Sequence, residues 1–435
     1  MVNVAAIFST LGNPNSLIPL AVKDISATTG MTAGSFITGS EEGQDRLIDE
    51  VGTQIIWLLG IPAFKWLFDK TVFKAYGFDS KFDVRNLKDK DVFEKIKEYA
   101  PTDSIRKGIE KIGTKQGAFK NVALWKFFIS TGATIATYIG LTRAKQAYTE
   151  NKIRQNLIDE YEKNKTKEQS ETNSNVSFKG IGDVVKTFAF SPVKNMWILD
   201  GAITGERLAD SRSPQEFIGY SIKEASTLCF MYYAGEKIQE WLEKRAQNKY
   251  NKSIGLDARV IEGGELQKTF ENGSIKKSLD EFKTVIDKDD AKIYEFLHKN
   301  MENEVIKVAQ QSDIISMYKK PQKWYEIFKK PEYTDKIDTR KYINLEDIKS
   351  TYKKIETLYS QYLDSMKNES SEEFFKGVKK LKRNSVLMNI GTCIFALGIV
   401  TPAIMLAKRF AKKDDKEFQT KAEIRKQLIE EGIIV

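Results

Sequence analysis

The sequence has very little of the chemistry on which enzymes and metal proteins depend. Its 435 residues include one histidine, His298, and only two cysteines, Cys229 and Cys393. A structural zinc site needs about four sulfur or imidazole ligands, so three such residues far apart exclude one. His298 stands beside Lys299 in a charged helical stretch and is expected at the surface. Both cysteines lie in apolar runs and are expected to be reduced and buried.

Three short patterns resemble catalytic or ligand-binding motifs, and each lacks an essential part. Gly113–Lys115 reads Gly-Thr-Lys, whereas a phosphate-binding loop needs Gly-Lys followed by a hydroxyl residue. Ser191 and Lys194 have the spacing of a penicillin-recognising enzyme, but the partner motifs are missing. Asp287–Asp290 lacks the glycine and the final glutamate of a calcium loop. We therefore expect a protein that is not an enzyme, with no cofactor and no metal.

Two further absences concern targeting and fold class. Residues Met1–Ser9 lack a basic region ahead of an apolar run, so no cleavable secretory signal is expected. No segment alternates apolar and polar residues over the length of a sheet. Apolar residues recur instead at three and four, as they do along 345–366, which predicts an all-α chain. The mean hydropathy of −0.42 is too polar for a chain embedded from end to end.

Long uncharged segments are the most informative feature that the sequence does contain. Ser385–Ala407 holds 23 consecutive residues without a charge, although 30% of the chain is charged. A helix of that length reaches about 34 Å, enough to cross a bilayer. Val122–Thr142 is a second candidate span, and its single charge, Lys126, argues against an ion-coupled carrier built on these two helices. The shorter runs Val51–Phe64 and Ala225–Gly235 are expected mainly as amphipathic helices at the membrane surface, which gives two to four embedded helices.

The charge of the chain suits an anionic surface but gives no orientation. The net charge is +9, and a lysine-rich solvated surface explains it as well as an anionic lipid partner does. Lys111, Lys115 and Lys120 precede the first long run, and Arg143 and Lys145 follow it. The second long run is also basic at both ends, so the positive-inside rule does not choose a side. No nucleic-acid partner is predicted.

Short blocks occur in the same order in the two halves of the chain. The first-half blocks and their second-half counterparts are Ile37–Gly39 with Ile203–Gly205, Asp49–Gly52 with Glu216–Gly219, Phe82–Arg85 with Leu256–Arg259, and Gly132–Ile135 with Gly391–Ile394. We interpret these matches as an internal duplication in which each half ends in one long apolar helix.

The duplication predicts a definite domain order. The predicted segments are a first helical repeat 1–160 that ends in the long apolar helix 122–142, a polar linker 161–180, the first part of the second repeat 181–264, an inserted solvated helical module 265–379, the long apolar helix of the second repeat 380–412, and a charged tail 413–435.

Small residues on the two long helices suggest how they pack. Gly132, Ala136 and Gly140 are spaced four apart, a pattern that lets two helix backbones approach closely in lipid. Gly391 and Gly398, seven apart, are the candidate facing surface on the other copy. These five residues are the predicted helix-packing site.

Two segments carry a resemblance to known sequences. Ile61–Lys70 and Ser177–Gly180 resemble blocks of uncharacterised bacterial helical proteins with predicted membrane segments. The resemblance covers the repeat cores and not the insert. It implies a membrane location, and it carries no activity with it.

Together these features favour a non-enzymatic, membrane-anchored scaffold or partner-binding protein. The expected location is a membrane, in particular the bacterial cytoplasmic membrane, and the apolar stripes of the insert 265–379 are the expected docking surface for a protein partner. A small transporter or channel formed between the two repeats is the first alternative, and it predicts a polar cavity. A soluble helical bundle that binds an acidic partner is the second. The oligomeric state is left open.

Overall fold

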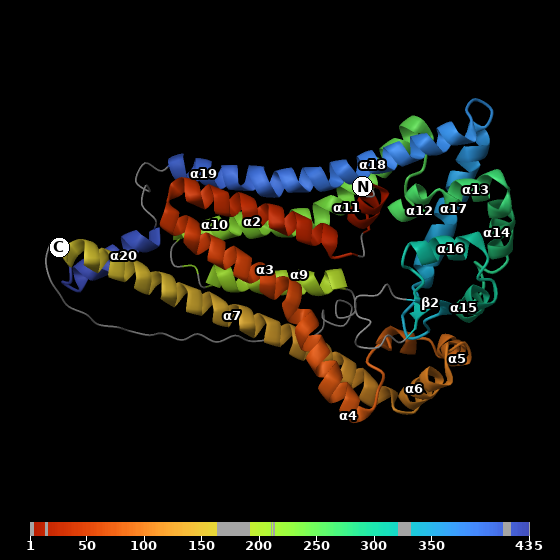
Figure 1. Cartoon of the computed structure of the whole chain (residues 1–435), viewed down its shortest axis with the longest axis horizontal. Coiled ribbons are helices and arrows are strands. Elements are labelled where there is room, and N and C mark those ends of the chain that lie inside the picture. Colours follow the sequence, from red (N-terminus) through yellow and green to blue (C-terminus); the bar gives the residue numbers. More distant parts are fainter. Residues whose placement is uncertain are drawn as a thin grey trace. The chain divides into compact units, whose positions relative to one another are not determined.

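The chain folds almost entirely into helices (Figure 1). The computed structural model describes residues 4–13, 16–162, 192–209, 211, 214–320, 332–411 and 419–434. Within these ranges the only sheet is one antiparallel pair, β1 (Met317–Lys319) with β2 (Tyr333–Ile337). The prediction of an all-α chain is therefore confirmed, and the predicted linker 161–180 lies outside the described residues from residue 163 onward.

Two compact units divide the chain, and each is assembled from separate segments. Unit 1 consists of Met1–Pro19, Leu67–Lys126 and Lys237–Asn389, and unit 2 consists of Leu20–Trp66, Phe127–Glu236 and Ile390–Val435. Each unit therefore contains residues from both halves of the sequence. The boundaries between the two units fall within long helices, so a single helix can contribute residues to both units.

Unit 1 is built from many short helices. They are α1 (Val4–Leu11), the π-helix η1 (Asp69–Phe73), α4 (Lys74–Tyr76), the 3₁₀-helix η2 (Val84–Leu87), α5 (Lys90–Glu98), α6 (Asp103–Thr114), α12 (Ala258–Gly263), α13 (Glu265–Glu271), α14 (Ser274–Lys283), α15 (Asp290–Lys299), α16 (Glu304–Gln311) and α17 (Leu345–Ser365). Side chains cap several of them. The Asp89 carboxylate accepts hydrogen bonds from the N–H groups of Asp91 and Val92, and Thr102 accepts one from Ile105.

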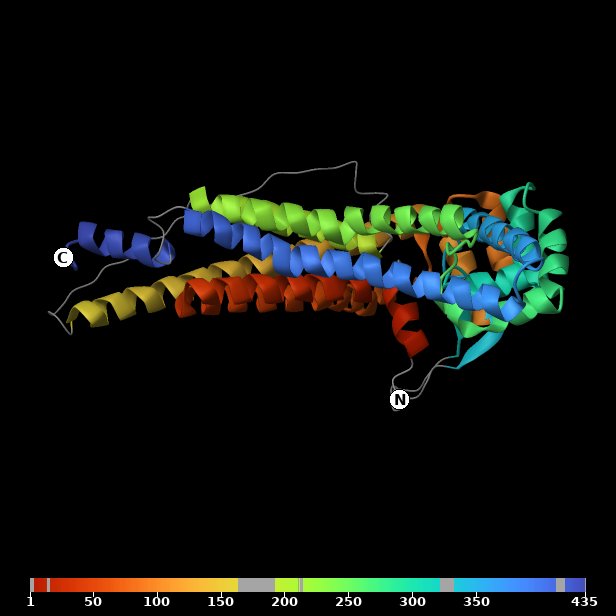
Figure 2. The same cartoon turned by 90° about the horizontal axis from the view of Figure 1, so that it is seen from above.

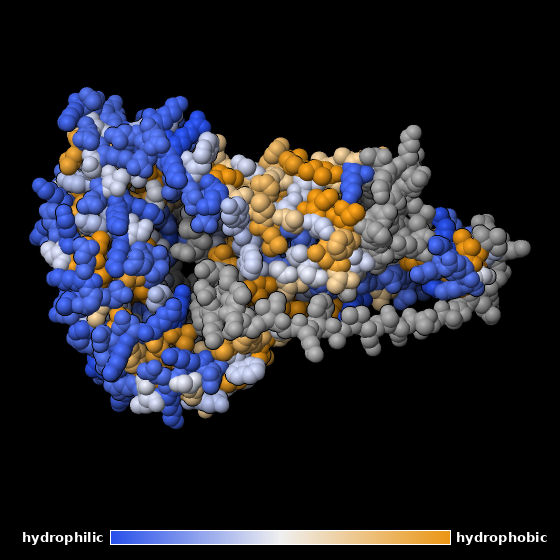
Figure 3. All heavy atoms as spheres, turned by 180° about the vertical axis from the view of Figure 1, so that it is seen from behind, coloured by the Kyte–Doolittle hydropathy of each residue, from blue (hydrophilic) through white to orange (hydrophobic). Residues whose placement is uncertain are grey.

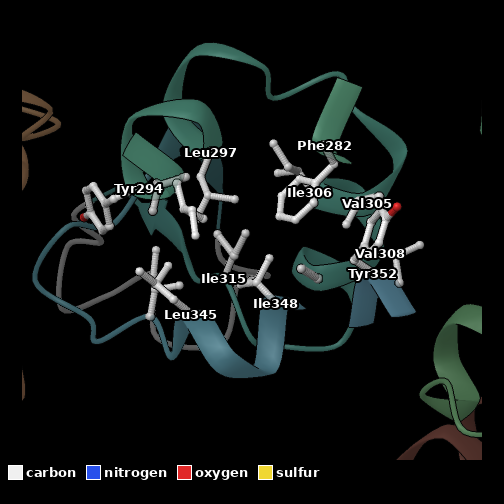
Figure 4. Close-up of a cluster of buried hydrophobic side chains, with 14 of the residues drawn as sticks. Phe282, Tyr294, Leu297, Val305, Ile306, Val308, Ile315, Leu345, Ile348 and Tyr352 are labelled. Atoms are coloured by element: carbon white, nitrogen blue, oxygen red, sulfur yellow. The ribbon is translucent and has the colours of Figure 1, made fainter. Parts of the chain in front are cut away.

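The core of unit 1 is made by the apolar stripes of these helices. Phe282, Leu297, Ile306 and Ile348 come from four different helices and meet in one buried cluster (Figure 4). The stripes that the sequence offered as a docking surface on the insert thus pack against one another. Burial in the core leaves these stripe side chains inaccessible to a partner, and a partner for other surfaces of the insert stays a prediction.

The single histidine lies inside unit 1 and not at its surface, contrary to expectation. The ring of His298 stacks on Tyr99 with centroids 4.5 Å apart and meets Tyr294 at 4.9 Å. Burial lowers the pKa of His298 to about 4, so the ring is neutral at pH 7. The charged neighbour Lys299 misled here, because it is exposed while α15 turns the ring of His298 toward Tyr99 and Tyr294.

Unit 2 is built from long helices that run alongside one another (Figures 1 and 2). It contains all or part of α2 (Ile18–Thr38), α3 (Ser40–Phe68), α7 (Gln116–Glu162), α9 (Pro192–Ala209), α10 (Pro214–Leu228), the π-helix η3 (Cys229–Tyr233), α11 (Ala234–Tyr250), α18 (Ser371–Phe395), the π-helix η5 (Ala396–Val400), α19 (Thr401–Ala411) and α20 (Gln419–Glu430). The tail helix α20 packs on the last turns of α7 through Leu428, Leu157 and Ile153.

Three helices are long and apolar enough to cross a membrane. They cover Gly43–Tyr76, Gln116–Tyr161 and Ser371–Lys408. The two long runs found in the sequence lie in the second and third, and the shorter run Val51–Phe64 belongs to the first. Its length as part of α3 exceeds what the sequence alone suggested for an interfacial segment.

The outer faces of the unit 2 helices are apolar. Exposed side chains on α3 include Ile48, Ile55 and Leu59, and Phe395 and Ile399 are exposed on the third candidate span. Figure 3 shows hydrophobic residues gathered over these helices, whereas hydrophilic residues cover the face of unit 1 in view. Cys229 is exposed, contrary to expectation, and Cys393 is buried as a free thiol.

Candidate functional site

The interior of unit 2 contains a network of buried charged side chains. Its eight members are Asp45, Arg46, Asp49 and Glu50 of α3, Lys145 of α7, Arg207 of α9, and Lys223 and Glu224 of α10. Four are carboxylates and four are cations, so the formal charges balance. We call this group the charge network.

Arg207 is the centre of the network. Its guanidinium Nη2 lies 3.0 Å from Asp49 Oδ2, and Nη1 lies 2.5 Å from Glu224 Oε1. The Nε–H donates to the hydroxyl of Tyr138 over 2.8 Å. The Arg207 side chain is only 4% exposed, and those of Asp49 and Glu224 are 5% and 6% exposed. One guanidinium therefore joins helices α3, α7, α9 and α10 out of contact with water.

Two lysines extend the network on either side of Arg207. Lys145 Nζ lies 3.4 Å from Asp49 Oδ1 and 3.7 Å from Asp45 Oδ2. Lys223 Nζ donates to both carboxylate oxygens of Glu50, over 2.6 and 2.9 Å. Each lysine thus connects α3 to a different helix, and each carboxylate of α3 has a cation as a close partner.

Helical spacing on α3 explains how one helix supplies four members. Asp45 and Asp49 are four residues apart, as are Arg46 and Glu50, so all four lie near one side of the helix. Arg46 Nη1 lies 3.6 Å from Glu50 Oε1. The Tyr220 ring lies 5.2 Å from the Arg46 guanidinium and 5.8 Å from that of Arg207, in cation–π range.

Glycines on α3 bring this helix close to α7. A Cβ added at Gly52 would lie 2.6 Å from Leu141, and one added at Gly60 would lie 2.6 Å from Thr134. The flexible end of Leu141 could move away from a Cβ at Gly52, but a Cβ at Gly60 would meet three atoms of the β-branched Thr134, so the close approach depends on glycine at position 60. The close packing holds Asp49 within reach of Lys145.

The five residues of the predicted helix-packing site are placed differently from one another. A Cβ added at Gly132, Gly140 or Gly391 would meet no atom within 4 Å, and Ala136 is exposed, so none of these four faces another described helix. Gly398 does pack closely, but its neighbours are Ser26 and Gly30 of α2. The structure therefore does not bring the two glycine surfaces together.

A second polar contact lies in the interior of unit 2 near the π-helix η3. The Tyr232 hydroxyl donates to the Asp200 carboxylate, which α9 supplies. Lys23 of α2 donates to the backbone carbonyl oxygen of Phe230 over 3.3 Å. The wider turn of a π-helix rotates the following residues relative to a regular helix, and such turns are frequent at functional sites.

Sequence reasoning missed the charge network because it searched only the two longest apolar runs. Lys145 lies just beyond the end of Val122–Thr142, and every other member comes from α3, α9 or α10. The argument from the two longest runs therefore does not extend to unit 2 as a whole, whose interior holds these charges. A signal was present in a pair of charged dipeptides, Asp49-Glu50 and Lys223-Glu224, each at the start of an apolar run.

A pocket in unit 1 is the remaining candidate site. It has a volume of about 440 Å³ and is lined by residues 87–116, among them Lys90, Glu94, Lys97, Glu110 and Thr114. Charges of both signs alternate around it, and the Gly113–Lys115 segment stands at the end of α6 rather than between a strand and a helix. This arrangement does not form a phosphate-binding loop.

Neither metal chemistry nor known relatives guide the assignment further. The part of the chain that the structure describes holds no group of three or more histidine, cysteine, aspartate or glutamate side chains placed to bind a metal ion. The chain matches no protein-family model, no curated protein and no solved structure. The function must therefore be argued from the geometry of the two units.

Proposed function

We propose that this protein is an integral membrane protein, with unit 2 in the bilayer and unit 1 in water. The distribution of polarity in unit 2 supports this proposal, because apolar side chains such as Ile55 and Ile399 face outward while charged ones such as Arg207 are buried. In a bilayer, outward apolar side chains and buried charged side chains are favourable, whereas in water the same arrangement is unfavourable. The alternative of a soluble bundle loses support for the same reason. The bacterial cytoplasmic membrane is the proposed location.

Within this membrane protein, we propose that the bundle conducts or transports a small ion or charged solute. The observation that carries this proposal is the charge network. A bundle that serves only as an anchor needs no buried charge, and ionisable groups inside membrane bundles commonly line ion or substrate pathways. Buried ion pairs add little net stability compared with apolar packing, so stability alone does not account for eight such groups.

Two measurements test the embedding. Membranes from cells that make the full chain are washed with alkaline carbonate, and we expect the protein to stay in the membrane pellet. Single cysteines at Lys115 and Lys152, before and after the apolar run of α7, are then labelled from one side with an impermeant reagent. We expect only one of the two to react from each side. Release by carbonate, or labelling of both from one side, would contradict a spanning α7.

Flux measurements test the pathway. The full chain is reconstituted in vesicles loaded with dyes for protons, sodium, potassium or chloride, and we expect flux of at least one of these ions. Asp49→Asn combined with Arg207→Gln removes one carboxylate and one cation, so the network stays balanced in charge although Glu224 and Lys145 each lose a partner, and we expect it to abolish the flux. The matched control is Asp69→Asn with Lys126→Gln, since that pair, 2.6 Å apart, belongs to unit 1.

The flux of the double variant shows whether the charge network serves an ion pathway or only the packing of the helices. Unchanged flux in the Asp49/Arg207 double variant would assign the network to helix packing and would overturn the pathway. Absence of flux for all four ions in the wild type would do the same.

The internal duplication also remains part of the proposal, and local geometry supports it. Asp83 accepts hydrogen bonds from the backbone N–H and from Nε of Arg85, and Asp257 makes the same two contacts with Arg259. Both pairs belong to the matched sequence blocks. The helices α3 and α10, which follow the earlier blocks, both continue into a π-helix.

A membrane-anchored scaffold is the second candidate function, and the separate core of unit 1 favours it. A unit of this size with its own core offers a surface for a protein partner. The exposed apolar side chains left on the insert are few, and Tyr333 and Leu363 are two of them. Photo-cross-linking from position 363 in cells should give one discrete adduct, with position 353 as the control. Equal products from both positions would contradict a docking site there.

A further inference from the structure

Five exposed lysines lie on one part of unit 1 with two exposed aromatic rings. Lys70 and Lys74 belong to η1 and α4, Lys111 and Lys115 lie at the end of α6, and Lys120 lies in the first turns of α7. Among the described residues, none of the five lysines forms an ion pair. Tyr76 is 54% exposed and Trp125 is 61% exposed. We call these five lysines with Tyr76 the lysine patch.

Contacts within unit 1 hold the three segments of the patch together. The rings of Phe78 and Phe119 meet edge to face at 5.4 Å, which joins the turn after α4 to the start of α7. Gly77 adopts φ +64°, and a Cβ added there would lie 2.5 Å from Lys111 Nζ. Lys111 therefore lies against the turn that ends α4, beside Tyr76.

The carboxylates near the patch leave its positive charge largely uncompensated. Asp69 is engaged by Lys126, with Nζ 2.6 Å from Oδ1. Glu110 is the acidic residue on the last turns of α6. Five lysines thus face one exposed glutamate in this part of unit 1.

The patch also lies next to the ends of two candidate spans. The first candidate span ends at Tyr76, and the second begins at Gln116. Exposed tryptophan and tyrosine with lysine at the end of an apolar helix are typical of the headgroup level of a bilayer. At the other end of the α7 apolar run, by contrast, Lys145 is buried and paired with Asp45 and Asp49. The two basic flanks therefore differ in that one of them contributes a buried lysine to the charge network, although Arg143 on that flank is exposed.

From these observations we propose that the lysine patch binds the headgroups of anionic phospholipids. The proposal rests on the membrane embedding of unit 2 and goes beyond it, because it assigns a lipid class and a set of residues. Lysine near an anionic surface gains electrostatic energy that falls away with salt. The aromatic rings at the same level fit the polar boundary of the bilayer, which a soluble anion does not provide.

The test counts lipids bound to the full chain. The purified protein in detergent is mixed with phosphatidylglycerol or phosphatidylcholine, and bound lipids are counted by native mass spectrometry. We expect the wild type to prefer phosphatidylglycerol by at least about tenfold, and added salt to reduce this preference. Lys70→Gln, Lys74→Gln, Lys111→Gln and Lys115→Gln made together should remove the preference. The same change at four exposed lysines elsewhere in unit 1, Lys276, Lys283, Lys288 and Lys353, should leave it intact.

Three results would overturn the proposal. They are equal binding of the two lipids by the wild type, equal loss in the patch and control variants, and displacement of phosphatidylglycerol by inorganic phosphate at constant ionic strength. Carbonate washing of the same variants distinguishes a failure of lipid binding by the patch from a failure of the membrane embedding of unit 2. Release of the wild type from membranes contradicts the embedding, whereas a patch variant that stays in the pellet but loses lipid preference supports the patch.

Discussion

Unit 1 and unit 2 are both helical, but they differ in which side chains are buried and which are exposed. In unit 1 the buried side chains are mainly those of an apolar core, such as Phe282 and Ile348, although a few charged ones such as Asp338 and Lys382 are buried with them. In unit 2 the buried side chains include Arg207 and Asp49, and isoleucines such as Ile55 lie outside. This difference is the one that the proposed location of unit 2 in a bilayer and of unit 1 in water requires.

The comparison also shows why average composition says little about this chain. Mean hydropathy averages a unit with a polar surface and a unit with an apolar one, and the result resembles a soluble protein. The predictions below test whether the two units really differ, beginning with the largest expected effect.

Replacement of Arg207 by alanine should be the most damaging single change in unit 2. It removes the nearest cation of Asp49 and of Glu224, which keep only Lys145 at 3.4 Å and Lys223 at 3.3 Å, and breaking such a buried pair costs about 3–5 kcal/mol. Thermal unfolding of the detergent-solubilised chain, followed by intrinsic fluorescence, measures the loss. The Asp49→Asn and Arg207→Gln double variant should lose much less. Equal losses in the two variants would mean that the pair is not a buried ion pair.

Lysine in place of Ile55 should distinguish lipid from water on the outside of unit 2. Ile55 is 55% exposed on α3, and lysine at the middle of a membrane helix costs about 3 kcal/mol. We expect reduced retention of the variant in carbonate-washed membranes. Leu363→Lys on α17 of unit 1 is the matched control and should change stability by less than about 0.5 kcal/mol. If both variants behave alike, the two units share one solvent.

Acid should weaken unit 1 through His298. The folded pKa of about 4 lies below the ordinary value, so this group stabilises the fold fully above pH 6.5, and the stabilisation is lost as pH falls toward 4. Allowing for the half-buried ring, the loss is about 2 kcal/mol between pH 7 and pH 4. His298→Phe keeps a ring in the stack and removes the titration. The unfolding free energy of the wild type relative to that of His298→Phe should therefore fall by about 2 kcal/mol between pH 7 and pH 4, and a constant difference across this range would contradict the burial.

The smallest effect expected is the loss of one helix cap in unit 1. Asp89→Ala removes the acceptor for two N–H groups at the start of α5, and such caps contribute about 1 kcal/mol. Chemical denaturation of the full chain should show this shift, and flux through unit 2 should be unchanged. A change in flux would mean that the units are coupled more strongly than two separate solvents require.

Much of the secondary structure could be predicted from the sequence, because helical periodicity is local. The stripe on α17, from Ile348 through Tyr352 and Ile355, appears in the sequence and is buried in the structure. What the stripe packs against could not be predicted, and for that reason a core stripe is easily mistaken for a docking surface. The division into two units was also out of reach, because each is assembled from distant segments.

The charge network could not be predicted from the sequence either, because its members are far apart along the chain. Asp49 and Arg207 are 158 residues apart, and Glu50 and Lys223 are 173 apart. Nothing local distinguishes these carboxylates from ordinary solvated ones at the edge of an apolar run. Only the packing of α3 against α7, α9 and α10 makes them a buried set.

The separation of Asp49 from Arg207 along the chain has a consequence for biosynthesis. Ribosomes add about 5–20 residues per second, so Asp49 emerges roughly 8–30 s before its cation. During that interval the cations available to the carboxylates of α3 are Arg46 and, once it is made, Lys145. If unit 2 is embedded as proposed, full insertion of α3 into lipid should therefore wait for α9 and α10, and a ribosome stalled before residue 207 should leave α3 less stably inserted.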